Sequence, residues 1–150
     1  SHGWRSLVGC FSLFTDDVIS YPRVTGIMGQ SVRLPCTYDG KVTTMCWGRG
    51  ACSWMGCESD IIWTNGYKVT FQKDKRYQLK GNIGRRDVSL TIEDTLLSDS
   101  GLYCCRIEKR GWFSDIKIIQ ELTINLGDGC IIWLDNCQFS LVAYMLCEPI

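Results

Sequence analysis

Apolar and polar residues alternate along short stretches of the chain between Val18 and Leu126. Val32, Leu34 and Cys36, for example, are separated by an arginine and a proline. An alternation with a period of two places the apolar side chains on one face of a strand. The pattern predicts strands over residues 32–36, 45–47, 61–63, 69–71, 76–79, 88–92, 102–107 and 116–124. Short strands separated by turn residues, without a helical period, predict an all-β sandwich.

A second pattern identifies the kind of sandwich. Cys36, Trp47 and Cys105 have the spacing of the core disulfide and core tryptophan of an immunoglobulin domain. The segment that begins at Asp99 reads Asp-Ser-Gly-Leu-Tyr-Cys-Cys, and its tyrosine lies two residues before the second core cysteine, as in a tyrosine corner. Arg76 stands where variable-type domains place an arginine that pairs with this aspartate. Together these residues predict an immunoglobulin sandwich.

Two of the expected strands are joined by a hairpin signal. Asn65-Gly66 lies between the apolar runs that contain Ile61 and Phe71. An Asn-Gly dipeptide favours a tight turn between antiparallel strands, because both residues tolerate positive φ angles. The hairpin supplies the additional strand pair of a variable-type domain. We therefore predict the fold class as all-β, a variable-type immunoglobulin sandwich.

The pattern divides the chain into three parts. Residues 1–17 have no usable periodicity and are an unassigned amino-terminal flank, whereas residues 18–126 form the immunoglobulin domain. Gly127-Asp128-Gly129 then breaks the pattern. Residues 127–150 are an unassigned tail, and no Ser/Thr/Pro-rich mucin stalk follows the domain. The longest apolar run of the tail, Leu141 to Cys147, is shorter than the about 20 residues of a spanning helix.

Composition narrows the function classes. The 16 basic residues balance the 16 acidic ones, so no net charge attracts the chain to nucleic acid. Ten cysteines indicate an oxidising, extracellular location, at the cell surface or secreted. The only histidine, His2, lies outside the domain, and no pair of nucleophile and base is apparent, so we do not expect an enzyme.

Four cysteines of the domain remain after the core pair. Cys46 and Cys104 each adjoin an inward-facing core residue, so their own side chains point out of the sheet. Cys52 and Cys57 lie in the glycine-rich stretch Gly48 to Glu58. The simplest arrangement folds this stretch back over the sheet and ties it twice, with three pairings open. The cysteines of the flanks pair with each other or stay reduced: Cys10, Cys130, Cys137 and Cys147.

Longer motifs also lie within residues 18–126. They are LPCTY at Leu34 to Tyr38, TMCWGRGAC at Thr44 to Cys52, WTNGYKVT at Trp63 to Thr70, RRDVSLTIED at Arg85 to Asp94, SDSGLYCCRIE at Ser98 to Glu108 and RGWFSD at Arg110 to Asp115. These motifs resemble the amino-terminal domain of the T-cell immunoglobulin and mucin-domain family. Within that family they are most similar to the hepatitis A virus cellular receptor (kidney injury molecule) branch. The doubled cysteine and the Gly-Trp-Phe tip make the resemblance specific.

The resemblance implies both a disulfide pattern and a function. The pairs it implies are Cys36–Cys105, Cys46–Cys57 and Cys52–Cys104. It also implies a cleft between the tied loop and the loop that joins the strands expected at 102–107 and 116–124. In family members this cleft holds a metal ion, usually calcium, and the ion holds the head group of phosphatidylserine. The expected partner is therefore a membrane that exposes phosphatidylserine.

The residues of the second loop have chemistry that suits this function. Trp112 and Phe113 are adjacent apolar residues at a predicted loop tip, and burying each in a lipid surface contributes roughly 1.5–3 kcal/mol. Trp54 and Met55 of the tied loop form a second apolar tip. Asp115 is a hard oxygen donor for calcium. Ser114 and Gly111 complete the expected set of metal ligands. The alternative is that the aromatics pack on the sheet and the aspartate caps a turn.

Ser114 departs from the family motif, which commonly reads Trp-Phe-Asn-Asp. An asparagine offers a carboxamide oxygen on a longer arm than the serine hydroxyl. We therefore expect a weakened calcium site. The alternative function is a protein–protein recognition module that binds another immunoglobulin-type receptor through the same face, with Trp54 and Trp112 as anchors. A truncated product with unselected flanks is a further alternative, and the chain has no sequon for N-glycosylation.

Overall fold

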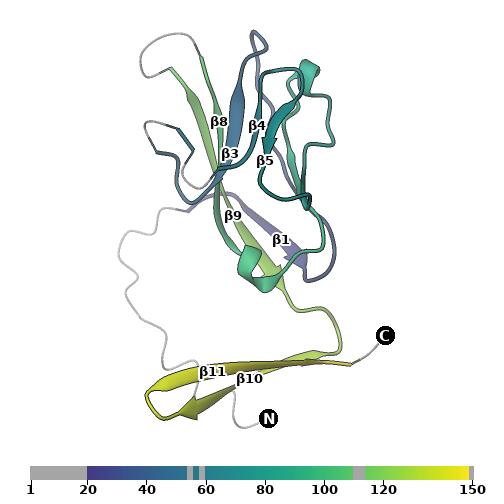
Figure 1. Cartoon of the computed structure of the whole chain (residues 1–150), viewed down its shortest axis with the longest axis vertical. Helices are drawn as coiled ribbons and strands as arrows, with labels where there is room; N and C mark the ends of the chain where they lie inside the picture. The colour runs from purple at the N-terminus through teal and green to yellow at the C-terminus, as the bar shows by residue number, and fades with distance from the viewer. Residues whose placement is uncertain (1–19, 54–55, 58–59, 110–113, 149–150) are drawn as a thin grey trace.

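Figure 1 shows the computed structural model of the chain, an elongated molecule with a sandwich at one end and a separate hairpin at the other. The structure describes residues 20–53, 56–57, 60–109 and 114–148. The only helical turns within these ranges are the short 3₁₀ segments η2 (Ile83–Arg85) and η3 (Leu97–Asp99). The domain is all-β, as predicted.

The sandwich consists of a six-stranded and a three-stranded sheet. The order in the larger sheet is β1 (Arg23–Ile27), β9 (Ile116–Asn125), β8 (Gly101–Ile107), β3 (Met45–Arg49), β4 (Asp60–Thr64) and β5 (Val69–Gln72). The smaller sheet contains β2 (Val32–Leu34), β7 (Leu90–Ile92) and β6 (Tyr77–Gln78). Each strand predicted from the alternation is present, with ends that differ by a few residues.

Strand β1 has no counterpart among the predicted strands. It pairs in parallel with β9, and all other strand pairs are antiparallel in the described part of the chain. Its half-buried positions are Val24 and Gly26. A Cβ atom at Gly26 would lie 3.1 Å from Ile124 and 3.2 Å from Val32. The glycine permits this close approach, and it also removes the apolar side chain that the alternation would have shown.

The core lies between the two sheets and is centred on the predicted disulfide. Cys36 and Cys105 are bonded, and both are buried. Trp47 is fully buried beside them, and its indole Nε1 donates a hydrogen bond of 2.7 Å to the carbonyl of Val88. The hydroxyl of Tyr103 donates to the carbonyl of Asp99 at 2.6 Å, which is the geometry of a tyrosine corner. The variable-type core predicted from the sequence is confirmed.

The predicted ion pair closes one end of the sandwich. Arg76 donates to both carboxylate oxygens of Asp99, at 2.9 and 3.0 Å. Burial alone would raise the pKa of Asp99, but the hydrogen bonds from Arg76 and the N–H of Leu96, together with the arginine charge, lower the pKa below its ordinary value. The aspartate is therefore ionised at neutral pH although it is almost fully buried.

The tail forms a separate hairpin, which the sequence did not predict. Strands β10 (Cys130–Cys137) and β11 (Ser140–Cys147) are antiparallel and form a two-stranded sheet. A disulfide joins Cys130 to Cys147, and the rings of Trp133 and Tyr144 stack at 5.7 Å. The hairpin lies apart from the sandwich in Figure 1. Among the residues described, no helix is long and apolar enough to cross a membrane.

Candidate functional site

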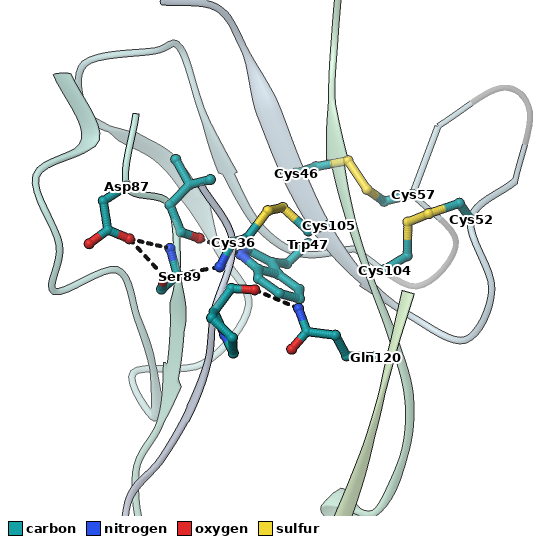
Figure 2. The surroundings of a disulfide bond; sticks show 12 residues. Cys36, Cys46, Trp47, Cys52, Cys57, Asp87, Ser89, Cys104, Cys105 and Gln120 are labelled. Carbon is teal, nitrogen blue, oxygen red and sulfur yellow. Dashed lines mark hydrogen bonds between the residues drawn. A yellow bond between two sulfur atoms is a disulfide. The ribbon is translucent and has the colours of Figure 1, made fainter. Parts of the chain in front are cut away.

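Two disulfides tie residues 50–59, the loop between β3 and β4, to the outer face of the larger sheet. Cys46 on β3 is bonded to Cys57, and Cys104 on β8 is bonded to Cys52. Figure 2 shows both bonds on the side of these strands opposite to the core disulfide. The structure therefore contains the pairs that the resemblance implied, and the loop folds back over the sheet as expected. Cys46 and Cys104 are buried beneath it.

An arginine on the same face links this tied loop to the loop between β8 and β9, residues 108–115. Arg106 lies directly opposite Cys46 in the β3–β8 register, and only 8% of its surface is exposed. Its Nη1 donates to the carbonyl of Ser53 in the tied loop at 2.9 Å. Its Nε and Nη2 donate to Oδ2 of Asp115 at 3.0 and 2.7 Å. One side chain thus contacts both loops of the expected cleft.

Sequence reasoning did not select Arg106, although a signal was present. Side chains two residues apart on a strand point to the same face. Arg106 therefore shares the outer face of β8 with Cys104, which parity had already assigned to that face. The aspartate with which the arginine pairs could not be identified in this way, because it lies in a loop.

Asp115 is held at the base of its loop. Oδ1 accepts a hydrogen bond of 3.0 Å from the backbone N–H of Lys109, across the ends of the loop. This hydrogen bond is the largest influence on the carboxyl group, and partial burial opposes it. The hydrogen bond from Arg106 and the charges of Arg106 and Lys117 add to it, so the pKa of Asp115 lies below its ordinary value. The carboxylate is ionised at neutral pH, and its side chain is 19% exposed.

Only one oxygen of the Asp115 carboxylate, Oδ1, is suited to bind a cation. Oδ2 of Asp115 accepts two hydrogen bonds from Arg106, whereas from the described residues Oδ1 accepts one, from the backbone N–H of Lys109, and keeps acceptor capacity. Calcium prefers such hard oxygen ligands and takes six to eight of them. Within the described ranges, no group of three or more His, Cys, Asp or Glu side chains could hold a metal ion. A calcium ion at this carboxylate would therefore need most of its ligands from backbone carbonyls or from another molecule.

Of the other predicted site residues, the structure describes Ser114, which is exposed and adjoins Asp115 in the chain. The expected ligand Gly111 and the expected apolar tips lie outside the described residues: Trp112, Phe113, Trp54 and Met55. The proximity of Ser53 and Asp115 to Arg106 nevertheless shows that the bases of the two loops are adjacent.

A hollow of about 440 Å³ lies where residues 41–43 meet Glu108 and Lys109. Its lining residues in the described part of the chain are Lys41, Val42, Thr43, Glu108 and Lys109. The hydroxyl of Thr44 donates a hydrogen bond of 2.6 Å to Glu108, one of these lining residues. Among the described residues that line this hollow, none belongs to the tied loop.

Comparison with known proteins agrees with this architecture. Residues 20–125 match the immunoglobulin V-set domain family. The chain is 58% identical over 109 residues to human hepatitis A virus cellular receptor 1, a match that covers 73% of this chain and 30% of that protein. It is 57% identical to the crystal structure of human T-cell immunoglobulin and mucin domain protein 1, with a TM-score of 0.69, covering 71% of this chain and 99% of that one. The chain belongs to the T-cell immunoglobulin and mucin domain family.

A further family structure is Tim-4 in complex with phosphatidylserine. It is 38% identical to the chain with a TM-score of 0.68, and the match covers 70% of this chain and 99% of that one. The curated relatives are longer proteins: the matched part of this chain spans from 23% to 39% of their length. The match to the V-set family ends before the β10–β11 hairpin.

Proposed function

We propose that this immunoglobulin domain binds phosphatidylserine on exposed membranes, in a calcium-dependent manner, through a cleft between residues 50–59 and 108–115. The observation that carries the proposal is the carboxylate of Asp115, which is ionised, fixed by Arg106 and the N–H of Lys109, and left with acceptor capacity on Oδ1. Support comes from a family member, Tim-4, whose structure was solved in complex with phosphatidylserine.

Each predicted residue has a distinct part in this proposal. Asp115 would hold the metal with one carboxylate oxygen, and Ser114 and Gly111 would supply the other protein ligands. Bound calcium would join this carboxylate to the anionic oxygens of the head group, which repel an unneutralised carboxylate. Trp112, Phe113, Trp54 and Met55 would enter the lipid surface at the two loop tips. The two outer disulfides and Arg106 hold the bases of both loops, which lowers the entropy cost of binding.

The cysteine pattern supports a function outside the cell. Four disulfides are typical of proteins in an oxidising compartment. We therefore place the domain at the cell surface or in a secreted form, acting as a receptor by binding and not by catalysis.

Liposome flotation tests the proposal. The full chain is mixed with vesicles of phosphatidylcholine with or without phosphatidylserine, in calcium or in a chelator. Co-flotation is expected only with phosphatidylserine and calcium together, and Asp115→Asn should abolish it, because the amide is nearly isosteric but uncharged. Glu121→Gln is a matched control, since Glu121 is a carboxylate that pairs with Arg23 on the exposed surface of β9. Binding that persists unchanged in chelator would contradict the proposal.

A second candidate function, recognition of another immunoglobulin-type receptor, is favoured by one observation. An open hollow of about 400 Å³ on β4 and β5 is lined by Asp60, Trp63, Thr70 and Phe71. Phe71 is 47% exposed. An exposed aromatic in an open hollow suits an anchor of a protein partner. Phe71→Ala should weaken binding to such a partner and leave liposome binding unchanged. Asp115→Asn should abolish liposome binding and leave binding to the protein partner unchanged.

A further inference from the structure

We propose that the β10–β11 hairpin joins two copies of this chain through the face that carries Trp133 and Tyr144. The hairpin lies beyond the region matched to the V-set family, and the proposed function makes no use of it. It also lies apart from the sandwich in Figure 1, and its apolar side chains are exposed to solvent. Joining two copies in this way requires neither lipid nor calcium.

The pairing register defines which side chains share this face. Side chains directly opposite each other on paired strands point to the same side of the sheet, as do positions two residues apart on one strand. Ile131 is opposite Leu146 and Trp133 is opposite Tyr144, so these four form one face, which we call the aromatic face. The rings of Trp133 and Tyr144 stack with their centroids 5.7 Å apart. The aromatic face is therefore an apolar surface that is continuous across both strands.

All four residues of the aromatic face are open to solvent. The exposed fractions are 52% for Ile131, 45% for Trp133, 44% for Tyr144 and 59% for Leu146. Together these side chains expose on the order of 400 Å² of largely apolar surface. An exposed patch of this kind marks a contact with another molecule. A two-stranded sheet is also only marginally stable in water, so a second layer packed on this face would stabilise the hairpin.

Charge and backbone pairing both disfavour a lipid surface as the occupant of the aromatic face. The chain from Leu126 to Ile150 contains the acidic residues Asp128, Asp135 and Glu148 and no basic residue. The anionic surface of a membrane repels this negative charge. In addition, each strand of the hairpin has one edge without a partner strand among the described residues. Backbone groups without partners are costly in hydrocarbon, so the hairpin is poorly suited to enter a bilayer.

A second copy of the hairpin matches the aromatic face in chemistry and in size. Two sheets can pack face to face about 10 Å apart with their apolar side chains interdigitated. With the surrounding backbone, each copy would bury about 500 Å², and the total of about 1,000 Å² reaches the lower limit of a specific interface. Asp135 is the only charged residue between Cys130 and Cys147, so repulsion between the copies is small at physiological salt. We therefore expect a dimer with a dissociation constant in the micromolar range.

The most symmetric contact places Trp133 near a two-fold axis. The row formed by Trp133 and Tyr144 lies between the row of Ile131 with Leu146 and the row that contains Asp135. In a two-fold dimer the same patch of both copies meets, so position 133 of one copy lies close to position 133 of the other. The dimer would hold two sandwiches together without using their surfaces.

Sedimentation velocity of the full chain, in chelator and without lipid, tests this assembly. Free thiols are alkylated first, so that no dimer is held by a disulfide between chains. The unmodified chain should pass from monomer to dimer as its concentration rises through the micromolar range. Trp133→Glu should raise the dissociation constant at least about tenfold, because it places a charge in an apolar contact. Leu141→Glu is the matched control: Leu141 is 65% exposed but lies opposite Asn136 on the other face, and its replacement should leave the dimer unchanged.

A mixing experiment separates loss of the contact from loss of the hairpin. Trp133→Lys alone should be monomeric like Trp133→Glu. An equimolar mixture of the two variants should recover the dimer, because opposite charges then meet near the two-fold axis. A disrupted hairpin would recover nothing on mixing, so a mixture that stays monomeric overturns the two-fold contact.

Three further outcomes would overturn the inference. The first is an unmodified chain that stays monomeric throughout the micromolar range. The second is a dimer that Trp133→Glu leaves intact or that Leu141→Glu disrupts to the same extent. The third is co-flotation of the unmodified chain with phosphatidylcholine vesicles in chelator that Trp133→Glu abolishes, which would identify lipid as the occupant. None of these results bears on calcium-dependent binding of phosphatidylserine, which liposome flotation tests separately.

Discussion

Cys104 and Cys105 are adjacent on β8, yet they anchor opposite faces of the strand: Cys104 is bonded to Cys52 of the tied loop and Cys105 to Cys36 of the core. Successive side chains of a strand point to opposite faces, so a doubled cysteine can fix a core and an external loop at one position. Figure 2 shows the two bonds on either side of β8. The external bond is the one that shapes the candidate site.

The double substitution Cys52→Ala with Cys104→Ala tests this division of roles. The lost bond closes a separation of 52 residues, and its removal should lower the free energy of unfolding by about 2–4 kcal/mol. The domain should still fold, because the core disulfide remains. Liposome binding should fall by much more than the small fraction of unfolded protein would explain, since the tied loop is then held by the Cys46–Cys57 disulfide alone. Denaturant unfolding and flotation in calcium measure the two effects. If the folded double variant binds liposomes as well as the unmodified chain does, the Cys52–Cys104 disulfide only stabilises the fold.

Much of the sandwich could be predicted because its residues alternate on one buried face. Parity also placed Cys46 and Cys104 on a common outer face, which the structure confirms. The β10–β11 hairpin was missed because Ile131 to Leu134 are consecutive apolar residues, and a strand that is apolar on both faces has no alternation to detect.

The chemistry of the candidate site was only partly predictable. Asp115 was predicted to be an oxygen ligand, but its ionic partner, Arg106, lies nine residues earlier on β8. In the sequence pattern an arginine on a strand looks like any solvent-facing polar residue. The distance between the two residues depends on how the loop of residues 108–115 returns to β9. Sequence spacing does not define that return, because loop conformation has no fixed period.

Asp99 should make the domain sensitive to acid. Its pKa is lower in the folded protein than the value of about 3.9 expected for an unfolded chain. The stabilisation from its ion pair with Arg76 is thus complete well above the unfolded pKa and is lost as the pH falls through the folded pKa. Asp99→Asn should cost about 2–4 kcal/mol at pH 7, because it leaves a partly buried guanidinium without its counter-charge. Denaturant unfolding of the unmodified chain and of Asp99→Asn, measured from pH 7 to pH 2, should show their unfolding free energies converging as the pH falls. A constant difference over this range would contradict the assignment.

Ser114→Asn should strengthen the proposed calcium site. The carboxamide oxygen lies on a longer arm than the serine hydroxyl and is a better calcium ligand beside Asp115. Half-maximal liposome binding should then need several-fold less calcium, which flotation over a calcium series measures. Ser114→Ala is the matched control and should need the same or more calcium than the unmodified chain. If asparagine gives no gain, the residue at position 114 is not a ligand.

The disulfide of the tail should stabilise the hairpin and nothing else. A two-stranded sheet is marginal in water, and the Cys130–Cys147 bond closes a separation of 17 residues, which contributes roughly 3 kcal/mol. Cys130→Ala with Cys147→Ala should therefore raise amide hydrogen exchange across residues 130–147 by about a hundredfold. The unfolding free energy of the sandwich should change by less than about 0.5 kcal/mol, because distant sites act independently. Cys46→Ala with Cys57→Ala is the converse control, and it should leave exchange in the hairpin unchanged. A joint loss of stability in the sandwich and the hairpin would instead show that they unfold as one cooperative unit.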